Sequence, residues 1–516
     1  MSPSPRLLLA FGLALAACGL GACGDDAPER PNVVVISLDT LRADALGAYG
    51  EKRATSPTFD RFASGAIVFD NAFSQAPMTA PSHMTLFTSL YPSVHRVNNL
   101  GAEGNRAQGR AGDVPAEWRV DPNTTTLAEL FRAAGWRTAA FHGGGNVNKS
   151  VGFDDGFEWF DGKPQNGMNG NADRPFDFTR AAAWIDEHAD EPFFLFLHTY
   201  VPHAPYVPPA PWDRAFDSDY AGPIPYRDAF LAAVQRGEPG PPPPGDGASA
   251  ARRRMSRHTP WQFWGYVDPD SEREVEHVRA LYAGDVRATD DALATMLAKL
   301  ASAGLDERTI VIVLSDHGEG FLEHGVFEHP GKLYRELVHV PLALRVPGLA
   351  PARVAAPVGL IDVAPTVCEL VGLPTPASMQ GRSFAPELRC EPAPLGAPTP
   401  GSRAVWSEFV PRWRDSEDGF VPLDLLRARR DERWTYLATL KDGVLVEELF
   451  DRAVDPGERH DLAALPEQAE RRLAFRAELD AEERACAAAR AKLKTQSAGE
   501  LEQSTLDDLK RLGYAR

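Results

Sequence analysis

The sequence predicts an α/β fold in which a mostly parallel β-sheet lies between layers of helices. Two apolar runs, Asn32–Ser37 and Thr309–Ser315, are rich in β-branched residues and fit strands that are buried on both faces. Strand-like and helix-like patterns alternate along the chain, which is typical of doubly wound layers. The two runs end next to Asp39 and Asp316. Because open α/β sheets bind ligands beyond the carboxyl ends of their strands, we expect both ends to form one site.

The composition is that of a soluble globular protein. Of the 516 residues, 43% are apolar and 24% are charged, and the length allows one large domain with a smaller one. The formal net charge of −18 argues against nucleic acid as a partner, because binding a polyanion requires cationic patches. An anionic substrate would therefore need positive charge at the site itself.

Residues 1–23 have the pattern of a secretion signal, because one arginine precedes an apolar stretch that is too short to span a bilayer. The segments Leu15–Cys18 and Leu20–Cys23 both resemble the lipobox of bacterial lipoproteins, in which the cysteine is lipidated. We therefore expect Cys18 or Cys23 to anchor the protein to a membrane of the bacterial cell envelope, on the periplasmic or outer-membrane face. The alternative is a signal that is cleaved without lipidation.

Shifts in composition divide the rest of the chain. A polar linker at 24–31 precedes an expected catalytic domain at 32–390, and a segment rich in proline and glycine then introduces a smaller unit at 391–465. The tail at 466–516 is rich in helix-forming residues. We expect an exposed insertion at about 213–270, because it contains a proline-rich stretch that cannot pack.

Periodicity and capping residues predict the further elements. Thr124–Gly135 has the pattern of a capped helix that ends at a glycine, and a long helix is expected at about Ser271–Ala303. Apolar runs predict strands at Trp136–Phe141, Pro192–His198 and Val340–Val346, and a β-hairpin made of Trp434–Leu440 and Val444–Leu449.

Thr79 is a candidate nucleophile because it lies where a helix is expected to begin. Pro81 is tolerated in a first helical turn, and the amides and dipole of a helix N-terminus favour negative charge. A hydroxyl there, beside a divalent cation held by Asp39, Asp316 and His317, could attack phosphorus or sulfur. The alternative is that Thr79 only caps the helix.

Several motifs occur in a characteristic order between about Pro31 and Leu465. They include Asn32–Asp39, Pro202–Pro209, Ser315–Glu319, Ile361–Val367 and Gln380–Ser383. With these motifs the chain resembles the sulfatase family of the alkaline phosphatase superfamily. The resemblance implies an alkaline-phosphatase-like α/β/α sandwich with a smaller C-terminal sheet-and-helix subdomain. It also implies hydrolysis of a sulfate ester.

The frame Thr79–His83 departs from the pattern of the family. Family members carry Cys or Ser, any residue, Pro, Ser and Arg in this frame, and the first residue is oxidised to formylglycine. Thr79 has one hydroxyl where the hydrated aldehyde has two, so a sulfated Thr79 would have to be cleared by water attacking sulfur. Water could clear a phosphorylated Thr79 at phosphorus, which favours a phosphoester. His83 replaces the arginine that steadies the hydrate, and we count it among the catalytic-site residues.

The resemblance implies one divalent metal ion. The carboxylates of Asp39 and Asp316, the imidazole of His317 and the hydroxyl of Thr79 are expected to bind it. Thr40 or water would complete the coordination. The family resemblance implies calcium, whereas an imidazole ligand moves the preference toward manganese or zinc. The identity of the ion stays open.

Histidine is the side chain best suited to protonate a leaving oxygen near neutral pH. The resemblance makes His203 the first candidate, with His198 as a reserve near the substrate. His329 and Lys332 are rivals for the position at which the family places an anion-binding lysine.

Other polar residues have lesser roles in this interpretation. His142 and Asn146 lie where the family carries a lysine and a histidine, and we expect them to contact the substrate. His95, His324 and His339 are expected to make local hydrogen bonds.

We therefore expect a hydrolase that uses Thr79 to cleave a sulfate or phosphate ester on a glycan, a lipid or a small molecule. Two other interpretations are considered beside it. One is an inactive lipoprotein that only binds an anionic glycan or lipid. The other is a two-metal phosphodiesterase in which His203, His324 and His329 supply further ligands.

Overall fold

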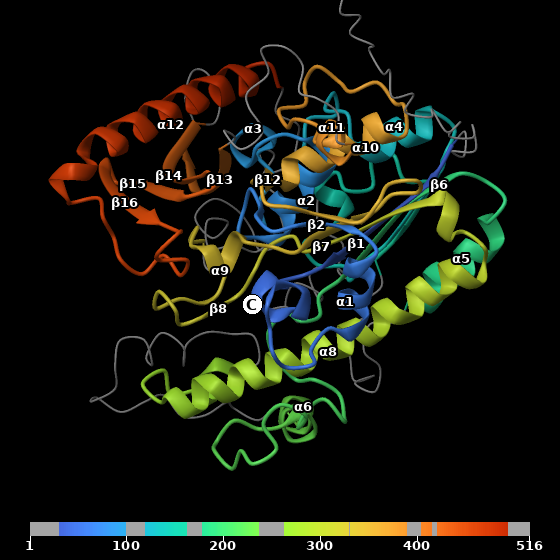
Figure 1. Cartoon of the computed structure of the whole chain (residues 1–516), viewed down its shortest axis with the longest axis horizontal. Helices are drawn as coiled ribbons and strands as arrows, with labels where there is room; N and C mark the ends of the chain where they lie inside the picture. The colour runs from blue at the N-terminus through green and yellow to red at the C-terminus, as the bar shows by residue number, and fades with distance from the viewer. Residues whose placement is uncertain are drawn as a thin grey trace, which may run out of the picture.

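The computed structural model describes residues 30–99, 119–162, 178–236, 263–329, 331–389, 404–414 and 421–493. An eight-stranded sheet lies between two layers of helices, and a second sheet follows it near the C-terminus (Figure 1). The predicted lipidation sites Cys18 and Cys23 lie outside the described residues. So do the proline-rich stretch at 237–250 and the tail beyond 493.

The central sheet confirms the predicted mostly parallel α/β architecture. Its strand order is β11-β2-β10-β7-β1-β6-β4-β5, and β10 is the one strand of this sheet that runs against the others. The central strand β1 pairs in parallel with β7 on one side and with β6 on the other. The bounds are β1 Asn32–Leu38, β2 Ile67–Phe69, β4 Arg137–Phe141, β5 Trp159–Asp161, β6 Phe193–Thr199, β7 Thr309–Leu314, β10 Leu342–Arg345 and β11 Ala352–Val354.

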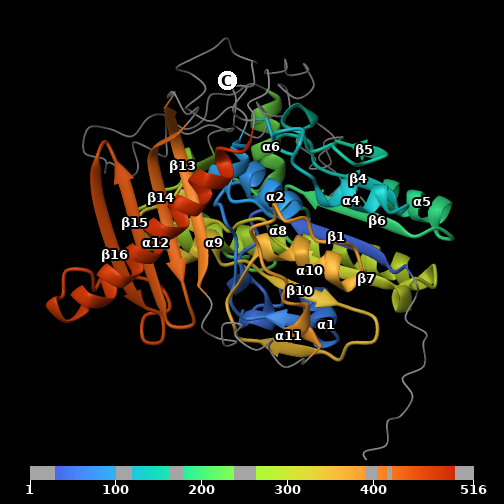
Figure 2. The same ribbon diagram turned by 90° about the horizontal axis from the view of Figure 1, so that it is seen from above.

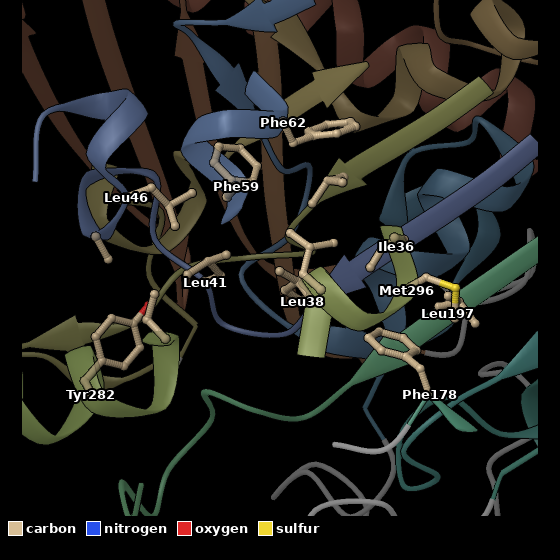
Figure 3. Close-up of a cluster of buried hydrophobic side chains, with 14 of the residues drawn as sticks. Ile36, Leu38, Leu41, Leu46, Phe59, Phe62, Phe178, Leu197, Tyr282 and Met296 are labelled. Carbon is tan, nitrogen blue, oxygen red and sulfur yellow. The ribbon is translucent and has the colours of Figure 1, made fainter. Parts of the chain in front are cut away.

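Successive side chains of β1 enter two different hydrophobic layers, because residues alternate between the faces of a sheet. Val34 and Ile36 pack against helices α1 (Pro57–Ser64), α5 (Thr179–His188) and α8 (Glu272–Ser302), as Figure 3 shows for Ile36 beside Met296 of α8. Val33 and Val35 pack against the opposite layer. That layer contains α2 (Thr79–Thr88), α4 (Leu127–Ala133), α10 (Val363–Leu370) and α11 (Ala385–Leu388), seen on the other side of the sheet in Figure 1.

The C-terminal part forms a four-stranded antiparallel sheet with one long helix across it (Figure 2). The sheet consists of β13 Val405–Arg414, β14 Val421–Arg430, β15 Trp434–Lys441 and β16 Val444–Asp451, and the helix is α12, Ala469–Arg490. The predicted hairpin is β15 and β16, whose turn residues Asp442 and Gly443 both have positive φ, as a tight hairpin turn requires.

Short elements connect these units. They are β3 Ala72–Phe73, α3 Pro92–His95, α6 Arg227–Gln235, β8 Gly320–Phe321, β9 Phe327–Glu328, α9 Arg335–Val338 and β12 Val358–Gly359. Among the described helices, none is both long and apolar enough to cross a membrane.

The described parts of the expected exposed insertion at about 213–270 are not exposed throughout. Tyr220, Phe230, Phe263 and Trp264 are buried and belong to the core beside α8. The ring of Tyr220 stacks on His277 of α8 with 3.5 Å between the ring centroids. Aromatic residues on both sides of the proline-rich stretch therefore return the chain to the core, and burial of their large apolar area stabilises that path.

His324 connects the central domain to the C-terminal segment. Its Nδ1 lies 2.7 Å from Oε1 of Glu336, and its Nε2 lies 2.7 Å from the carbonyl oxygen of Glu458. Both nitrogens face acceptors, so the imidazole is held as a donor on both sides. Burial opposes the charge, but Glu336 and Glu458 outweigh it and raise the pKa of His324 to about 9.

This pKa predicts a loss of stability in mild alkali. The unshifted value is 6.5, so the charged contact contributes fully below about pH 6.5 and is lost as the pH rises through about 9. We expect the free energy of unfolding, measured with urea at about pH 6.5 and again above about pH 9, to fall less between the two pH values in His324→Gln than in wild type. His460→Gln, at a largely exposed histidine, is the matched control. Equal pH dependence in wild type and His324→Gln would contradict the prediction.

Candidate active site

The ends of β1 and β7 bring the expected metal ligands together. Asp39 follows β1 and Asp316 with His317 follows β7, and because these strands are parallel neighbours their carboxyl ends coincide. One ligand atom from each of the three residues lies within 4.8 Å of the others, and all three side chains are buried. Within the described ranges this is the one group of three or more His, Cys, Asp or Glu side chains that could hold a metal ion.

Thr79 is the first residue of α2, and its hydroxyl points at this group. Its Oγ1 donates a hydrogen bond to Oδ2 of Asp39 at 3.2 Å and lies 3.4 Å from Nε2 of His317. Nδ1 of His317 donates to the carbonyl oxygen of Gly318 at 2.9 Å, and burial lowers the pKa of His317 to about 3. The imidazole is therefore neutral, and the lone pair of Nε2 faces Thr79 and the carboxylates.

The unsatisfied oxygens of the two carboxylates fit a divalent cation. Oδ1 of Asp39 and Oδ2 of Asp316 are buried and have no hydrogen-bond partner among the described residues. Burial, with repulsion from Asp39, raises the pKa of Asp316 to about 7. Two adjacent buried carboxylates are costly unless a positive charge lies between them. Asp39, Asp316, His317 and the Thr79 hydroxyl supply the mixed oxygen and nitrogen donors that such an ion accepts.

The hydroxyl of Thr40 does not join the proposed ligands. Thr40 has a positive φ of 55°, which turns its side chain back so that Oγ1 donates to the carbonyl oxygen of Asp39 at 2.8 Å. Its amide instead donates to Oδ1 of Asp316 at 3.3 Å. Thr40 therefore orients the carboxylate of Asp316 through its backbone, and its expected role as a side-chain ligand is corrected.

His83 is buried beside Thr79 and Asp316, and its Nδ1 lies 3.5 Å from Oδ2 of Asp316. Its Nδ1 donates to the carbonyl oxygen of Thr79 at 2.8 Å, and its Nε2 lies 2.9 Å from the hydroxyl of Ser37 on β1. Burial lowers the pKa of His83 to about 4, so the ring is neutral and accepts from Ser37. We therefore correct its expected catalytic role to that of a positioning residue.

Further contacts fix the N-terminus of α2. The amide of Ala80 donates to Oδ1 of Asn99 at 2.8 Å, and the hydroxyl of Ser82 donates to the carbonyl oxygen of Asp316 at 2.6 Å. Asn99 was not predicted from the sequence, because its position along the chain gives no sign that it lies beside this helix. These bonds connect the helix that carries Thr79 directly to the end of β7.

A second row of side chains lies beside the cluster. The ring of His329 is 4.5 Å from that of His317 and 4.9 Å from that of His203, between centroids. Nδ1 of His329 lies 3.1 Å from Oε1 of Glu319, a buried residue whose pKa burial raises to about 8. Burial lowers the pKa of His203, but nearby carboxylates, Asp39 first, outweigh it and raise that pKa.

Of the two rivals for the anion-binding position, His329 is buried beside the candidate metal ligands, whereas Lys332 points to the surface. Lys332 is exposed, because the chain turns at Gly331, which has a φ of 72°. The sequence analysis omitted Glu319 from the site residues, although it follows His317 by two positions. Gly318 between them has to be glycine, since a Cβ there would overlap the carbonyl oxygen of Glu336.

His198 reaches the cluster, whereas His142 and Asn146 lie beyond it. Nε2 of His198 donates to Oδ2 of Asp39 at 3.3 Å, and its Nδ1 accepts from the amide of Gly143 at 3.5 Å. Burial lowers the pKa of His198 to about 4, so it orients Asp39 as a neutral ring. His142 follows β4, two strands from β1, and its ring packs on Phe160. The amide of Asn146 donates to the hydroxyl of Tyr200 at 2.7 Å.

The remaining histidines make the local contacts expected of them. Nε2 of His95 lies 3.2 Å from the carbonyl oxygen of Pro81, and Nε2 of His339 lies 2.9 Å from that of Asp70. His324 bonds Glu336, as described above. The further ligands considered for a two-metal site, His203, His324 and His329, are not part of the metal-ligand group found among the described residues.

Known proteins share both the sequence pattern and the fold. The sulfatase family model matches residues 31–373. The Delta 4,5-hexuronate-2-O-sulfatase of Bacteroides thetaiotaomicron is 26% identical over 480 residues, which cover 91% of each protein. A phosphonate monoester hydrolase of Agrobacterium radiobacter has a similar structure, with a TM-score of 0.65, 22% identity, and coverage of 89% of this chain and 96% of that one.

A second similar structure was solved in complex with its substrate, D-glucosamine-2-N,6-O-disulfate. Its TM-score is 0.66 at 18% identity, and the match covers 90% of this chain and 98% of that one. At these identities the two structures show a shared fold. The family match covers most of the chain and includes Asp39, Thr79, Asp316 and His317. The chain therefore belongs to the sulfatase family of ester hydrolases.

Proposed function

We propose that the protein hydrolyses an anionic ester with Thr79 as the nucleophile and with one divalent cation held by Asp39, Asp316 and His317. The observation that carries this proposal is the position of the Thr79 hydroxyl. It lies 3.2 Å from a carboxylate oxygen of Asp39 and 3.4 Å from Nε2 of His317, at the start of a helix. A hydroxyl that only capped the helix would instead accept a hydrogen bond from an amide of the first turn, and Thr79 makes no such bond among the described residues.

The cation would neutralise charge on the transferring group and favour the alkoxide form of a neighbouring hydroxyl. Two carboxylates and a hydroxyl suit calcium, which the family resemblance also implies, whereas the imidazole of His317 suits manganese or zinc. Four hydrogen bonds orient these ligands. Asp39 accepts from Thr79 and His198, Asp316 accepts from the amide of Thr40, and His317 donates to the carbonyl oxygen of Gly318.

The chain's own residues can carry the proton transfers. Oγ1 of Thr79 attacks the central atom of the ester, and its proton passes to Oδ2 of Asp39, to which it already donates. A new bond forms from Oγ1 to that atom while the bond to the leaving oxygen breaks. His203, whose pKa nearby carboxylates raise, protonates the leaving oxygen, with the adjacent His329 as the second candidate. Water then hydrolyses the modified threonine and restores its hydroxyl.

Phosphorus is the central atom that Thr79 favours. A threonine ester has no second hydroxyl on the same carbon through which it could collapse, so water must attack the central atom in the second step. That route is available to a phosphothreonine, and a phosphonate monoester hydrolase shares the fold. Sulfur is the second candidate, because the relatives named above are sulfatases. A sugar bearing the anionic group is the favoured substrate class, since relatives act on hexuronate or bind a disulfated glucosamine.

Replacement of Thr79 tests the nucleophile. We expect Thr79→Ala to lower kcat at least about 10³-fold, because no other side chain replaces the attacking oxygen, and Thr79→Ser to retain part of the activity. Matched aryl phosphate, bis-aryl phosphate and aryl sulfate esters measure turnover and identify the attacked atom. Thr88→Ala is the control, because Thr88 is buried on the same helix and its hydroxyl bonds only backbone groups, the carbonyl oxygen of Met84 and the amide of Leu90. Unchanged turnover in Thr79→Ala would refute the proposal, and wild type inactive on every ester would favour a binding lipoprotein.

Metal content tests the cation site. We expect about one divalent ion per chain in wild type by elemental mass spectrometry, and loss of that ion in Asp316→Asn, which removes a charged ligand. Asp285→Asn is the matched control, because Asp285 is another buried carboxylate but lies on α8 outside the cluster. Two ions per chain would support the two-metal phosphodiesterase, and equal metal content in wild type and Asp316→Asn would rule out the assigned ligands.

We propose further that the chain is exported and held at the bacterial cell envelope by a lipid on Cys18 or Cys23. The support is the apolar leader with two lipobox-like segments. Intact mass of protein extracted from membranes is expected to show a lipidated N-terminal cysteine. Cys18→Ala and Cys23→Ala, made separately, identify which cysteine is used. Release of the double variant but not of wild type from membranes is expected, and an unlipidated soluble wild type would contradict the anchor.

A further inference from the structure

The structure contains a cavity of about 460 Å³, and none of Asp39, Thr79, Asp316 and His317 lines it. Its wall comes from the loop after β1, from α8, from α9 and from the segment at 456–459 that follows the C-terminal sheet. A volume of this size matches the pockets in which proteins bind small molecules.

The wall of the cavity is highly charged, with five arginines and four carboxylates. Three of the arginines are neutralised by carboxylates of the same wall: Arg42 lies 2.7 Å from Asp44 and 2.6 Å from Glu323, Arg53 lies 2.6 Å from Glu51, and Arg279 lies 3.2 Å from Glu323. The fourth carboxylate, Glu336, bonds the protonated His324. Every acidic side chain of the wall therefore has a cationic partner.

Two arginines of the wall are left without such a partner. The guanidinium groups of Arg335 and Arg459 make no hydrogen bond and no ion pair with any described residue, and both line the cavity. Arg335 is half-buried, and Arg459 is exposed. His339, also in the wall, does not change this balance, because burial lowers its pKa to about 3 and leaves it neutral.

The surroundings of Arg335 make its unpaired charge costly. Burial lowers the pKa of Arg335, and the positive charges of Arg430 and Arg42 lower it further. Asp44 and Glu458 raise this pKa, but neither forms an ion pair with Arg335. Glu458 is itself engaged, since it pairs with Arg430 at 3.2 Å and accepts from the amide of Arg335 at 2.8 Å. A negative charge inside the cavity would relieve this cost.

We propose that this cavity binds a doubly charged tetrahedral oxyanion, a sulfate or phosphate group, between the guanidinium groups of Arg335 and Arg459. Two planar forks of N–H donors match the several oxygens of such a group, and two positive charges match its charge. The ion can be free or carried on a larger molecule, since the cavity is open and larger than one ion.

The site is separate from the proposed catalytic centre and does not rest on the proposed function. Nη1 of Arg42 in the cavity wall donates to the carbonyl oxygen of Glu319 at 3.0 Å, while the side chain of Glu319 bonds His329. The segment around Glu319 thus has the cavity on one side and the catalytic cluster on the other. An anion bound at Arg335 and Arg459 would therefore not occupy the place of the ester.

Titration calorimetry with sodium sulfate, sodium phosphate and sodium acetate tests the site on the full chain. We expect saturable binding of sulfate or phosphate by wild type, and a loss of affinity of about tenfold or more in Arg459→Ala and in Arg335→Ala. Acetate, with one charge, is expected to bind at least about tenfold more weakly. Arg132→Ala, at an exposed arginine of α4 outside the cavity, is the matched control and is expected to bind as wild type does.

Asp316→Asn distinguishes anion binding in the cavity from anion binding at the catalytic cluster. This variant is expected to leave the affinity for sulfate or phosphate unchanged. Glycerol phosphate in place of inorganic phosphate shows whether the site also accepts the group on a larger molecule. Equal affinity in wild type and Arg459→Ala would overturn the proposal, and this variant is decisive even if Arg335→Ala does not fold, because Arg459 is exposed. Acetate binding as tight as that of sulfate would overturn the assignment of a dianion.

Discussion

The geometry of the candidate active site depends on two carboxylates that are buried side by side. Asp39 and Asp316 are buried, each keeps one oxygen without a hydrogen-bond partner in the described structure, and burial raises the pKa of both. Such a pair is unfavourable unless a cation balances it. The parallel pairing of β1 with β7 enforces the arrangement, because it brings the residues that follow both strands to the same edge of the sheet. The proposed metal binding and the stability of this edge would therefore both follow from one arrangement.

The same framework fixes Thr79, the proposed nucleophile. The first turn of α2 is tied to β1 through His83 and Ser37, and to the end of β7 through Ser82 and the backbone of Asp316. The hydroxyl of Thr79 can then point at the carboxylates without a flexible loop to position it. Because these contacts are made by neutral, buried groups, they restrict the helix without adding charge to a region that already holds two acids. A rigid, preorganised site of this kind suits a reaction in which charge develops on the transferred group.

The sequence predicted the fold and the grouping of Asp39, Asp316 and His317 because strong local signals report them. β-branched runs that end in an acid occur at β1 and β7, and the order of motifs indicates the family. The roles of single side chains were less accessible. The hydroxyl of Thr40 turns away because its backbone adopts a positive φ, and Lys332 is exposed because the chain turns at Gly331. Contacts of this kind depend on backbone angles and distant neighbours, such as Asn99 beside Ala80, which no local pattern reports. The expected exposure of the whole insertion failed for a similar reason, because aromatic residues on both sides of the proline-rich stretch pack in the core.

The most direct test of this account is mass spectrometry of the peptide that contains Thr79, after wild type is acid-quenched during the first turnover of an aryl phosphate and, separately, of an aryl sulfate. The account predicts a phosphoryl or sulfuryl group covalently attached to Thr79, which forms when substrate is added and is absent without it. Turnover during which Thr79 stays unmodified at every quench time would contradict the central claim, because the ester would then be attacked by water without the help of this side chain.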